Sequence, residues 1–186
     1  MSLLDLVHAL QTAQGHTIMA TPQRDGQTVT REGDPAGQEL IAGVAVRECK
    51  NVLTRSGSLL EVFRSDWPEL SVVPAQVNWV VLWPQGVTDW HRHLEQTDHL
   101  VFVFGVIKLC LHDDREDSPT RGSSNIFRFG DLRPAAVVVP PGVWHGLRNE
   151  TGAPAGFLNY FATPYSHEDP DNWRLSHDSP ELPCPL

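Results

Sequence analysis

Short runs of β-branched and aromatic residues, separated by glycine and proline, recur along most of this chain. One run covers 77–83 and ends at Pro84-Gln85-Gly86, and two more runs, 100–104 and 106–111, are divided by Gly105. Runs of this kind, bounded by turn residues, are typical of β-strands. The same pattern predicts further strands at 39–47, 59–63, 125–129, 135–139 and 157–162. Many short strands and only one clear helix predict an all-β sandwich or barrel.

The N-terminal part of the chain has a different character. Residues 2–10 have the pattern of a short amphipathic helix, with Ser2 as the N-cap and Gly15 as the stop. Residues 20–38 are rich in Gly, Pro, Thr, Gln and Asp, which predicts a loop or arm. We therefore divide the chain into a helix and arm over 1–38 and a barrel over 39–186. The polar, proline-rich tail after Pro164 is expected to wrap the outside of the barrel or a partner subunit.

Composition narrows the class of protein. A chain of 186 residues with 40% hydrophobic residues predicts one globular domain. The net charge of −9, with no basic run, argues against nucleic-acid and acidic-membrane partners. No apolar run is long enough for a transmembrane helix and no signal peptide is evident, so a cytoplasmic location is expected. Cys49, Cys110 and Cys184 are odd in number and far apart, which predicts reduced thiols.

Three histidines and one aspartate form the candidate chemistry. His91 and His93 are two residues apart, so they share a face if their segment is a strand. Asp98 opens the following strand, and Pro140-Pro141-Gly142 predicts a tight turn that aims His145 back into the barrel. Imidazole and carboxylate groups are the usual ligands of divalent transition metals such as Fe, Mn, Ni or Zn. His91, His93, Asp98 and His145 are therefore the predicted metal ligands, with open positions left for a substrate.

Four further residues are predicted to contact substrate. Trp90 and Trp144 flank the histidines in sequence and could stack on a sugar or a base. Arg148 lies just after His145, and with Asn149 it could also hydrogen-bond the metal ligands. Asn159 lies on the last predicted strand. His99, next to Asp98, is expected to face outward and to be structural.

Two spaced motifs carry a resemblance to the cupin superfamily. The first motif consists of Gly86, His91-x-His93, Asp98 and Gly105, with Asp98 where Glu is usual. The second consists of Pro140-x-Gly142-x-x-His145-x-x-x-Asn149. Together the two motifs are a strong signal. The resemblance implies a single cupin double-stranded β-helix, or jelly-roll, barrel.

A narrower resemblance covers roughly residues 40–182. The chain looks like the dTDP-4-dehydrorhamnose 3,5-epimerase family, including its sugar-nucleotide isomerase relatives. That family is dimeric and inverts carbons next to a keto group without a metal, so the resemblance implies a homodimer and a carbohydrate-type substrate. The segments that carry it are 60–63, 117–120, 139–146, Phe157-Leu158 and Tyr165-Ser166.

The resemblance assigns roles to some residues and leaves others open. His91 occupies the place of the family's catalytic base, and His145 that of its second pocket histidine, so both are predicted to be catalytic. The family's phosphate-binding Arg falls near Asp89 or Trp90. Its enolate-stabilising Lys falls on Asp98.

The family's proton-donating Tyr falls on Asn159, which is no acid. Tyr160 and Tyr165 are the nearby alternatives, but Tyr160 should face away from the pocket if Asn159 points into it. At the Lys position, Asp98 would oppose an oxyanion. A metal held by Asp98 would neutralise that carboxylate.

Three functions follow as hypotheses. The first is an epimerase or isomerase acting on a carbohydrate or sugar-nucleotide-type substrate at a divalent metal site, with a metal-free acid–base pocket as its variant. The second is a metal-dependent cupin dioxygenase of a small organic acid. The third is a non-catalytic, sugar-binding cupin. All three place the function in the pocket that holds His91 and His145.

Overall fold

The computed structural model describes residues 24–31, 36–70 and 72–186. The chain divides into two units, Met1–Gly37 and Gln38–Leu186, and the second unit forms the barrel. The helix predicted at 2–10 lies outside the described residues. Within the described ranges, no helix has the length and apolar character needed to cross a membrane.

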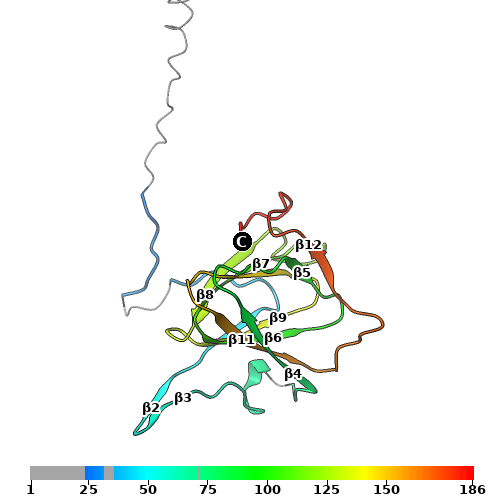
Figure 1. Cartoon of the computed structure of the whole chain (residues 1–186). Coiled ribbons are helices and arrows are strands. Elements are labelled where there is room, and N and C mark those ends of the chain that lie inside the picture. The colour runs from blue at the N-terminus through cyan, green and yellow to red at the C-terminus, as the bar shows by residue number, and fades with distance from the viewer. Residues whose placement is uncertain (1–23, 32–35, 71) are drawn as a thin grey trace, which may run out of the picture. The chain divides into compact units, whose positions relative to one another are not determined.

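Two five-stranded antiparallel sheets form the barrel (Figure 1). The first sheet has the order β1 (Ala45–Glu48), β9 (Ala135–Val139), β6 (Asp98–Phe104), β11 (Ala155–Phe161), β4 (Gln76–Leu82). The second has the order β12 (Trp173–Leu175), β5 (Trp90–Arg92), β10 (Trp144–Asn149), β7 (Val106–His112), β8 (Ser124–Gly130). A hairpin of β2 (Val52–Thr54) and β3 (Gly57–Leu59) and a 3-10 turn, η1 (Pro68–Leu70), complete the described elements. The predicted all-β jelly-roll architecture is confirmed.

The predicted strands agree with the structure where hydrophobic residues alternate, and they differ at four places, one of which is the unpredicted strand β2. The segment 39–47 is a strand only from Ala45, because Ile41 and Val44 form a turn whose side chains enter the core. The segment 59–63 is a strand only at its first residue, Leu59, which ends the β2–β3 hairpin, and residues 62 and 63 pack over the outer face of the first sheet. The short β12 in the C-terminal tail was not predicted.

The main core lies between the two sheets and follows the two-residue period of the strands. On β7, Ile107, Leu109 and Leu111 are fully buried in this core, whereas Lys108 and Cys110 face the other side. This alternation defines an inner and an outer face for every strand of the second sheet. The inner face of β5 carries His91, and that of β10 carries His145.

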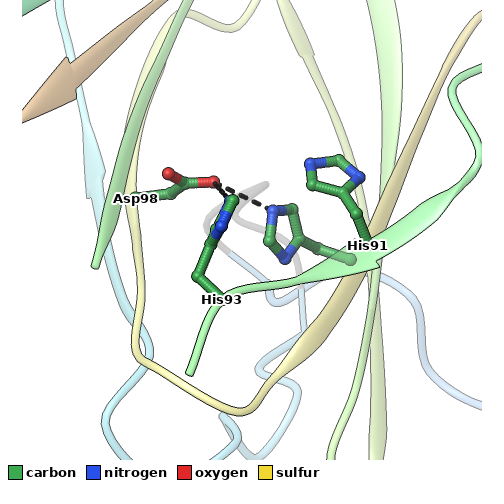
Figure 2. A group of neighbouring side chains, drawn as sticks. His91, His93 and Asp98 are labelled. Atoms are coloured by element: carbon green, nitrogen blue, oxygen red, sulfur yellow. Dashed lines mark hydrogen bonds and ion pairs between the residues drawn. The ribbon is translucent and has the colours of Figure 1, made fainter. Parts of the chain in front are cut away.

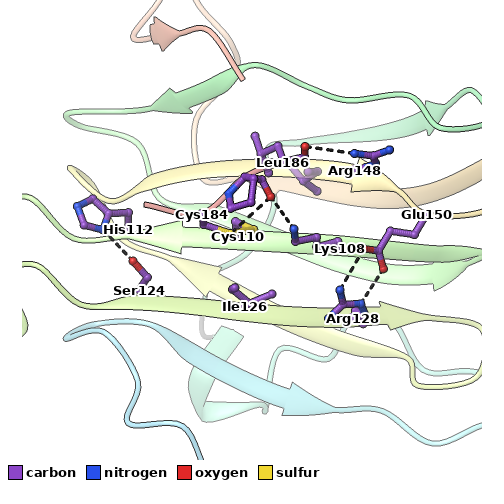
Figure 3. Close-up of a disulfide and its surroundings, with 12 residues drawn as sticks. Lys108, Cys110, His112, Ser124, Ile126, Arg128, Arg148, Glu150, Cys184 and Leu186 are labelled. Atoms are coloured by element: carbon purple, nitrogen blue, oxygen red, sulfur yellow. Dashed lines mark hydrogen bonds and ion pairs between the residues drawn. A yellow bond between two sulfur atoms is a disulfide. The ribbon is translucent and has the colours of Figure 1, made fainter. Parts of the chain in front are cut away.

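The C-terminal segment covers part of the outer face of the second sheet. Leu182, Cys184 and Leu186 pack against Trp90 and Cys110 there. Cys184 forms a disulfide with Cys110, and hydrogen bonds from Lys108 and Arg148 to nearby carbonyls hold the same segment (Figure 3). The prediction of reduced thiols is therefore wrong for Cys110 and Cys184, which are 74 residues apart, while Cys49 is a free thiol.

Gly105 makes the tight connection between β6 and β7 possible. Its φ is +69°, a left-handed conformation that favours glycine. A Cβ atom at this position would lie 2.5 Å from the Cβ of Ala155 on the neighbouring β11. Any other residue would push these strands apart.

Candidate active site in the barrel

His91 and His145 lie side by side on the inner face of the second sheet. They are direct partners in the antiparallel register of β5 and β10, and their ring centroids are 4.0 Å apart. His93 follows one residue after β5, and its ring turns back toward Asp98 (Figure 2). The two predicted histidines of the first motif therefore reach one cluster from the end of the same strand.

The carboxylate of Asp98 is the centre of this cluster. Asp98 is the first residue of β6 and is only 1% exposed. Its Oδ2 lies 2.9 Å from Nε2 of His145 and 3.4 Å from Nε2 of His93. Its Oδ1 accepts hydrogen bonds from the side-chain amides of Gln96 (3.0 Å) and Asn159 (3.4 Å). Both oxygens of a buried carboxylate thus have partners, as burial of a charge requires.

Burial and neighbouring charges shift the pKa values in different directions. Burial alone would raise the pKa of Asp98, but the hydrogen bonds from His145 and His93 outweigh it and hold the pKa well below its usual range. For His93, burial lowers the pKa, but the hydrogen bond and charge of Asp98 prevail and raise it. For His91, burial and then the adjacent His145 lower the pKa to about 3. His91 is therefore a neutral imidazole at physiological pH.

Each of the three imidazoles directs its Nδ1 at a backbone carbonyl oxygen. The pairs are His91 with Asp89 (3.1 Å), His93 with Asp171, and His145 with Val143 (3.1 Å). Because a carbonyl only accepts, Nδ1 carries a proton in each ring and Nε2 is left for the cluster. Metal-bound histidines are oriented in this way.

The four predicted metal ligands are brought together. One ligand atom each from His91, His93, Asp98 and His145 lies within 4.8 Å of all the others. Both ring nitrogens of His145 face acceptors.

The turn before β10 connects the two halves of the cluster. Gly142 has a φ of +82°, and its N–H donates to the carbonyl of His93 (2.7 Å). The N–H of Val143 donates to the carbonyl of Pro140 (3.4 Å), which closes the turn. The turn predicted from Pro140-Pro141-Gly142 therefore both aims His145 and fixes the backbone of His93.

Asp171 is a site residue that the sequence did not reveal. Its carboxylate accepts hydrogen bonds from the backbone N–H groups of Leu94 (2.8 Å), Glu95 (2.8 Å) and Gln96 (3.0 Å), and its carbonyl accepts from His93. Asp171 thereby fixes the loop between β5 and β6. Its partners lie 75 to 78 residues earlier in the chain, so no local pattern points to it.

A pocket of about 320 Å³ adjoins the cluster. This volume falls in the range of small-molecule sites, roughly 300–1,000 Å³. Gln96 and Asp171 belong to both the pocket and the cluster, because Gln96 hydrogen-bonds Asp98 and Asp171 holds His93. The pocket is lined by Glu95, Gln96, Thr163, Pro164, Tyr165, Ser166, Asp169 and Asp171.

The predicted substrate contacts take different places. Asn159 lies in the cluster, whereas Trp90 and Trp144 pack on the outer face of the second sheet. Arg148 also projects from that face and donates to the carbonyl of Leu186 and the side chain of Gln85. The structure therefore does not bring Trp90, Trp144 or Arg148 to the histidines.

Two supporting residues, Asn149 and His99, lie outside the cluster. Asn149 does not hydrogen-bond the predicted ligands; its side-chain amide donates to the carbonyls of Leu82, Trp83 and Ala153 and ties two connections together. His99 points away from Asp98 as expected, but it is buried at 4% exposure. It shares the outer face of β6 with Val101, which packs against Trp67 and Tyr160.

Comparisons of the sequence with known proteins find relatives named for glycan or polysaccharide biosynthesis. No protein-family model matches the chain. The chain is 39% identical over 139 residues to the probable low-salt glycan biosynthesis epimerase Agl13 of Haloferax volcanii, covering 74% of this chain and 89% of that protein. It is 29% identical over 139 residues to the spore coat polysaccharide biosynthesis protein SpsL of Bacillus subtilis, covering 75% and 91% of the two chains.

The fold has close counterparts among solved structures. The dTDP sugar isomerase of Desulfovibrio desulfuricans G20 superimposes with a TM-score of 0.72 and 26% sequence identity. The match covers 79% of this chain and 94% of that structure. The similarity thus extends over the barrel that holds the histidine cluster.

Proposed function

This chain belongs to the family of sugar epimerases related to dTDP-4-dehydrorhamnose 3,5-epimerase, and from that premise we propose that it epimerises or isomerises a keto sugar carried on a nucleoside diphosphate. One observation carries the proposal. His91 presents a neutral imidazole beside a buried, polarised cluster, with its Nδ1 proton held by a backbone carbonyl and its Nε2 directed inward. A neutral imidazole with a free, oriented Nε2 can accept a proton as a general base.

The proposed reaction begins with transfer of a proton from the carbon next to the keto group to Nε2 of His91. The C–H electron pair becomes a carbon–carbon double bond, and the carbonyl electrons move onto oxygen. The resulting oxyanion needs a positive environment. The negative charge of Asp98 would work against this oxyanion. His93 and His145 both hydrogen-bond the carboxylate and reduce that effect.

Return of the proton to the opposite face of the sugar requires a second acid. The chain contains two tyrosines. The hydroxyl of Tyr160 donates to the carbonyl of Val62 on the outer side of the first sheet, as its position after Asn159 predicted. Tyr165 lines the pocket that shares Gln96 with the cluster. We therefore assign the second proton transfer to Tyr165.

Asn159 supplies a polar contact for the sugar. Its Nδ2 donates to Asp98, whereas its Oδ1 is buried without a hydrogen-bond partner. A buried acceptor without a donor is costly, so a ligand hydroxyl that donates to it is favoured. This supports the predicted role of Asn159 in substrate binding.

A divalent metal ion is the second part of the proposal. The donor set fits, because three imidazoles with Nδ1 held by carbonyls and one buried carboxylate converge within 4.8 Å. His93, Asp98 and His145 would hold the ion, with His91 as a fourth ligand or as the free base. When bound, such an ion supplies positive charge beside a developing oxyanion.

Deuterium incorporation tests the proposed function directly. A nucleoside diphosphate 4-keto-6-deoxy sugar incubated with the enzyme in deuterated water should gain deuterium at a carbon next to the keto group, detected by mass spectrometry and NMR. The His91→Asn variant should lose this exchange, whereas His112→Asn, outside the cluster, should retain it. Absence of exchange with the wild-type enzyme for every such sugar offered would refute the proposal.

We also propose a homodimer. Strand β4 is an edge strand. Val77, Trp79 and Val81 on its outer face and Trp83, directly after it, are between 41% and 74% exposed. An exposed apolar row on a sheet edge favours pairing with another chain. Light scattering coupled to size exclusion should give the mass of a dimer, and Trp83→Glu should shift it toward the monomer; a monomeric wild type would contradict this proposal.

A further inference from the structure

The short strand β12 places an arginine beside the proposed base. Arg174 is the register partner of His91 in the pairing of β12 with β5, and His91 is in turn the partner of His145. We propose that Arg174 binds the diphosphate group of the nucleotide sugar and so sets the orientation of the substrate in the pocket. This inference rests on the proposed function and adds a residue to it.

The register fixes which way Arg174 projects. Directly paired residues of antiparallel strands have their side chains on the same face, with Cβ atoms roughly 4.5–5.5 Å apart. Arg174 therefore projects from the inner face of the second sheet, next to His91. Its neighbours Trp173 and Leu175 pair with Arg92 and Trp90, so they lie on the outer face.

The other basic residues on the strands of the second sheet are already engaged on its outer face. The side chain of Arg174, in contrast, is exposed and forms no hydrogen bond or ion pair within the part of the chain that the structure describes. The engaged pairs are Arg92 with Asp114 (3.0 Å), Lys108 with the carbonyl of Pro185 (2.6 Å), Arg128 with Glu150 (2.7 Å) and Arg148 with the carbonyl of Leu186 (3.2 Å).

Acidic residues surround Arg174, so its positive charge is the feature that would attract a diphosphate. The chain has a net charge of −9, and the pocket beside the cluster is lined by Glu95, Asp169 and Asp171. A diphosphate would be repelled from those carboxylates and attracted to a free guanidinium, whose planar donors match phosphate oxygens. Asp89, two positions before His91, is a nearby carboxylate. It contacts His177 and does not pair with Arg174.

The same argument gives the direction of binding. With the diphosphate at Arg174, on the exposed edge of the sheet, the sugar extends inward to His91 and the buried cluster. The edge strand is held on both sides, since Asp171 binds the loop after β5 and Cys184 binds β7. These contacts on either side of β12 hold Arg174 in place, and both come from the C-terminal part of the chain.

Binding of dTDP, inorganic pyrophosphate and thymidine to the full-length enzyme tests the inference by calorimetry. Arg174→Ala should weaken dTDP and pyrophosphate binding at least about tenfold, as expected for loss of a charged contact to phosphate, and leave thymidine unaffected. Arg174→Lys should retain part of the affinity. With the sugar nucleotide, KM should rise while kcat changes little, because the contact lies away from the reacting carbon.

Arg128→Ala is the matched control, because Arg128 belongs to the same sheet but is paired with Glu150 on its outer face. Its dTDP affinity should equal that of the wild type, and all variants should have wild-type circular dichroism. Equal dTDP affinity of Arg174→Ala and wild type would overturn the role of Arg174 while leaving the epimerase function intact. Failure of the wild type both to bind dTDP and to exchange deuterium would overturn the two proposals together.

Discussion

Asp98 and His145 lie 47 residues apart in the chain, yet the carboxylate Oδ2 and the imidazole Nε2 are 2.9 Å apart inside the barrel. Each residue comes from a different sheet, Asp98 from β6 and His145 from β10. Their contact therefore joins the two sheets at one end of the core. The same carboxylate also contacts His93, so one negative charge is shared between two histidines.

The Asp98→Asn variant should lose activity. The amide has the same size as the carboxylate but no charge, so the two imidazoles of His93 and His145 lose their contact with a negative charge. We expect a fall in kcat of about a hundredfold or more, the size of effect of removing one positioned polar group from a catalytic site. Steady-state kinetics would measure it, and Asp117→Asn, at an exposed position in the loop after β7, is the control; wild-type kcat in Asp98→Asn would show that the carboxylate has no role.

Tyr165→Phe should separate the two halves of the reaction. His91 can still remove the proton, so deuterium should enter the substrate from solvent. Delivery from the opposite face is lost, so inversion should slow by about 10²–10⁴-fold, the usual contribution of a positioned acid. NMR of the product sugar reports both events, and inversion at an unchanged rate would exclude Tyr165 as the acid.

The disulfide between Cys110 and Cys184 predicts a specific thiol count. Alkylation of the unfolded, non-reduced protein should label Cys49 alone, and reduction should expose the other two cysteines to the reagent. Cys184→Ala should lower the free energy of unfolding by about 2–5 kcal/mol, because the bond closes a long loop in the unfolded chain. Cys49→Ala is the control, and labelling of all three cysteines before reduction would disprove the bond.

Asp113 makes stability depend on acid pH. Burial would raise its pKa, but hydrogen bonds from Arg115, Ser118 and Thr120 outweigh burial and hold the pKa well below the ordinary value. The unfolded chain therefore binds this proton at a higher pH than the folded chain does. The stabilisation is present above a pH of about 4, the value in unfolded chains, and is lost as pH falls further.

Urea unfolding at a series of pH values checks this sign. The gap in unfolding free energy between wild type and Asp113→Asn should be largest near neutrality and should shrink below a pH of about 4. Asp117→Asn should show no comparable gap, since its carboxylate is exposed. A gap that stays constant with pH would contradict the pKa shift.

The sequence predicted the fold and the cluster well for a physical reason. Strands such as 135–139 and the turn at Pro140-Pro141-Gly142 are local patterns, and strand alternation places His91, Asp98 and His145 on inner faces, with His93 two residues after His91. In contrast, Asp171, β12 and the Cys110–Cys184 bond depend on where the tail returns to the barrel. Such contacts span more than 70 residues and leave no local signal.

The tryptophans show a second limit of the sequence-based prediction of site residues. Trp90 and Trp144 are adjacent to site histidines in sequence, but adjacent residues of a strand face opposite sides of the sheet. They therefore pack under the C-terminal segment, away from the cluster. Arg174, which no motif indicated, is on the same face as His91 because the two residues are register partners.

Metal content is the remaining test of the cluster. Untagged protein purified without chelator should contain a stoichiometric divalent transition metal by elemental mass spectrometry, because the oriented imidazoles and the buried carboxylate form a complete donor set. Removal with a chelator should lower turnover, and the same metal should restore it. His93→Ala should lose the ion, whereas His112→Ala should keep it.

His91→Ala then separates the two roles of His91. Retention of the ion with loss of turnover would show that His91 is the base and that His93, Asp98 and His145 are sufficient ligands. Loss of the ion would make His91 a ligand, and the base would have to be another group. If wild-type protein holds no metal and takes up none on reconstitution, the cluster is a hydrogen-bonded network without an ion, and the reaction depends on His91 and Tyr165 alone.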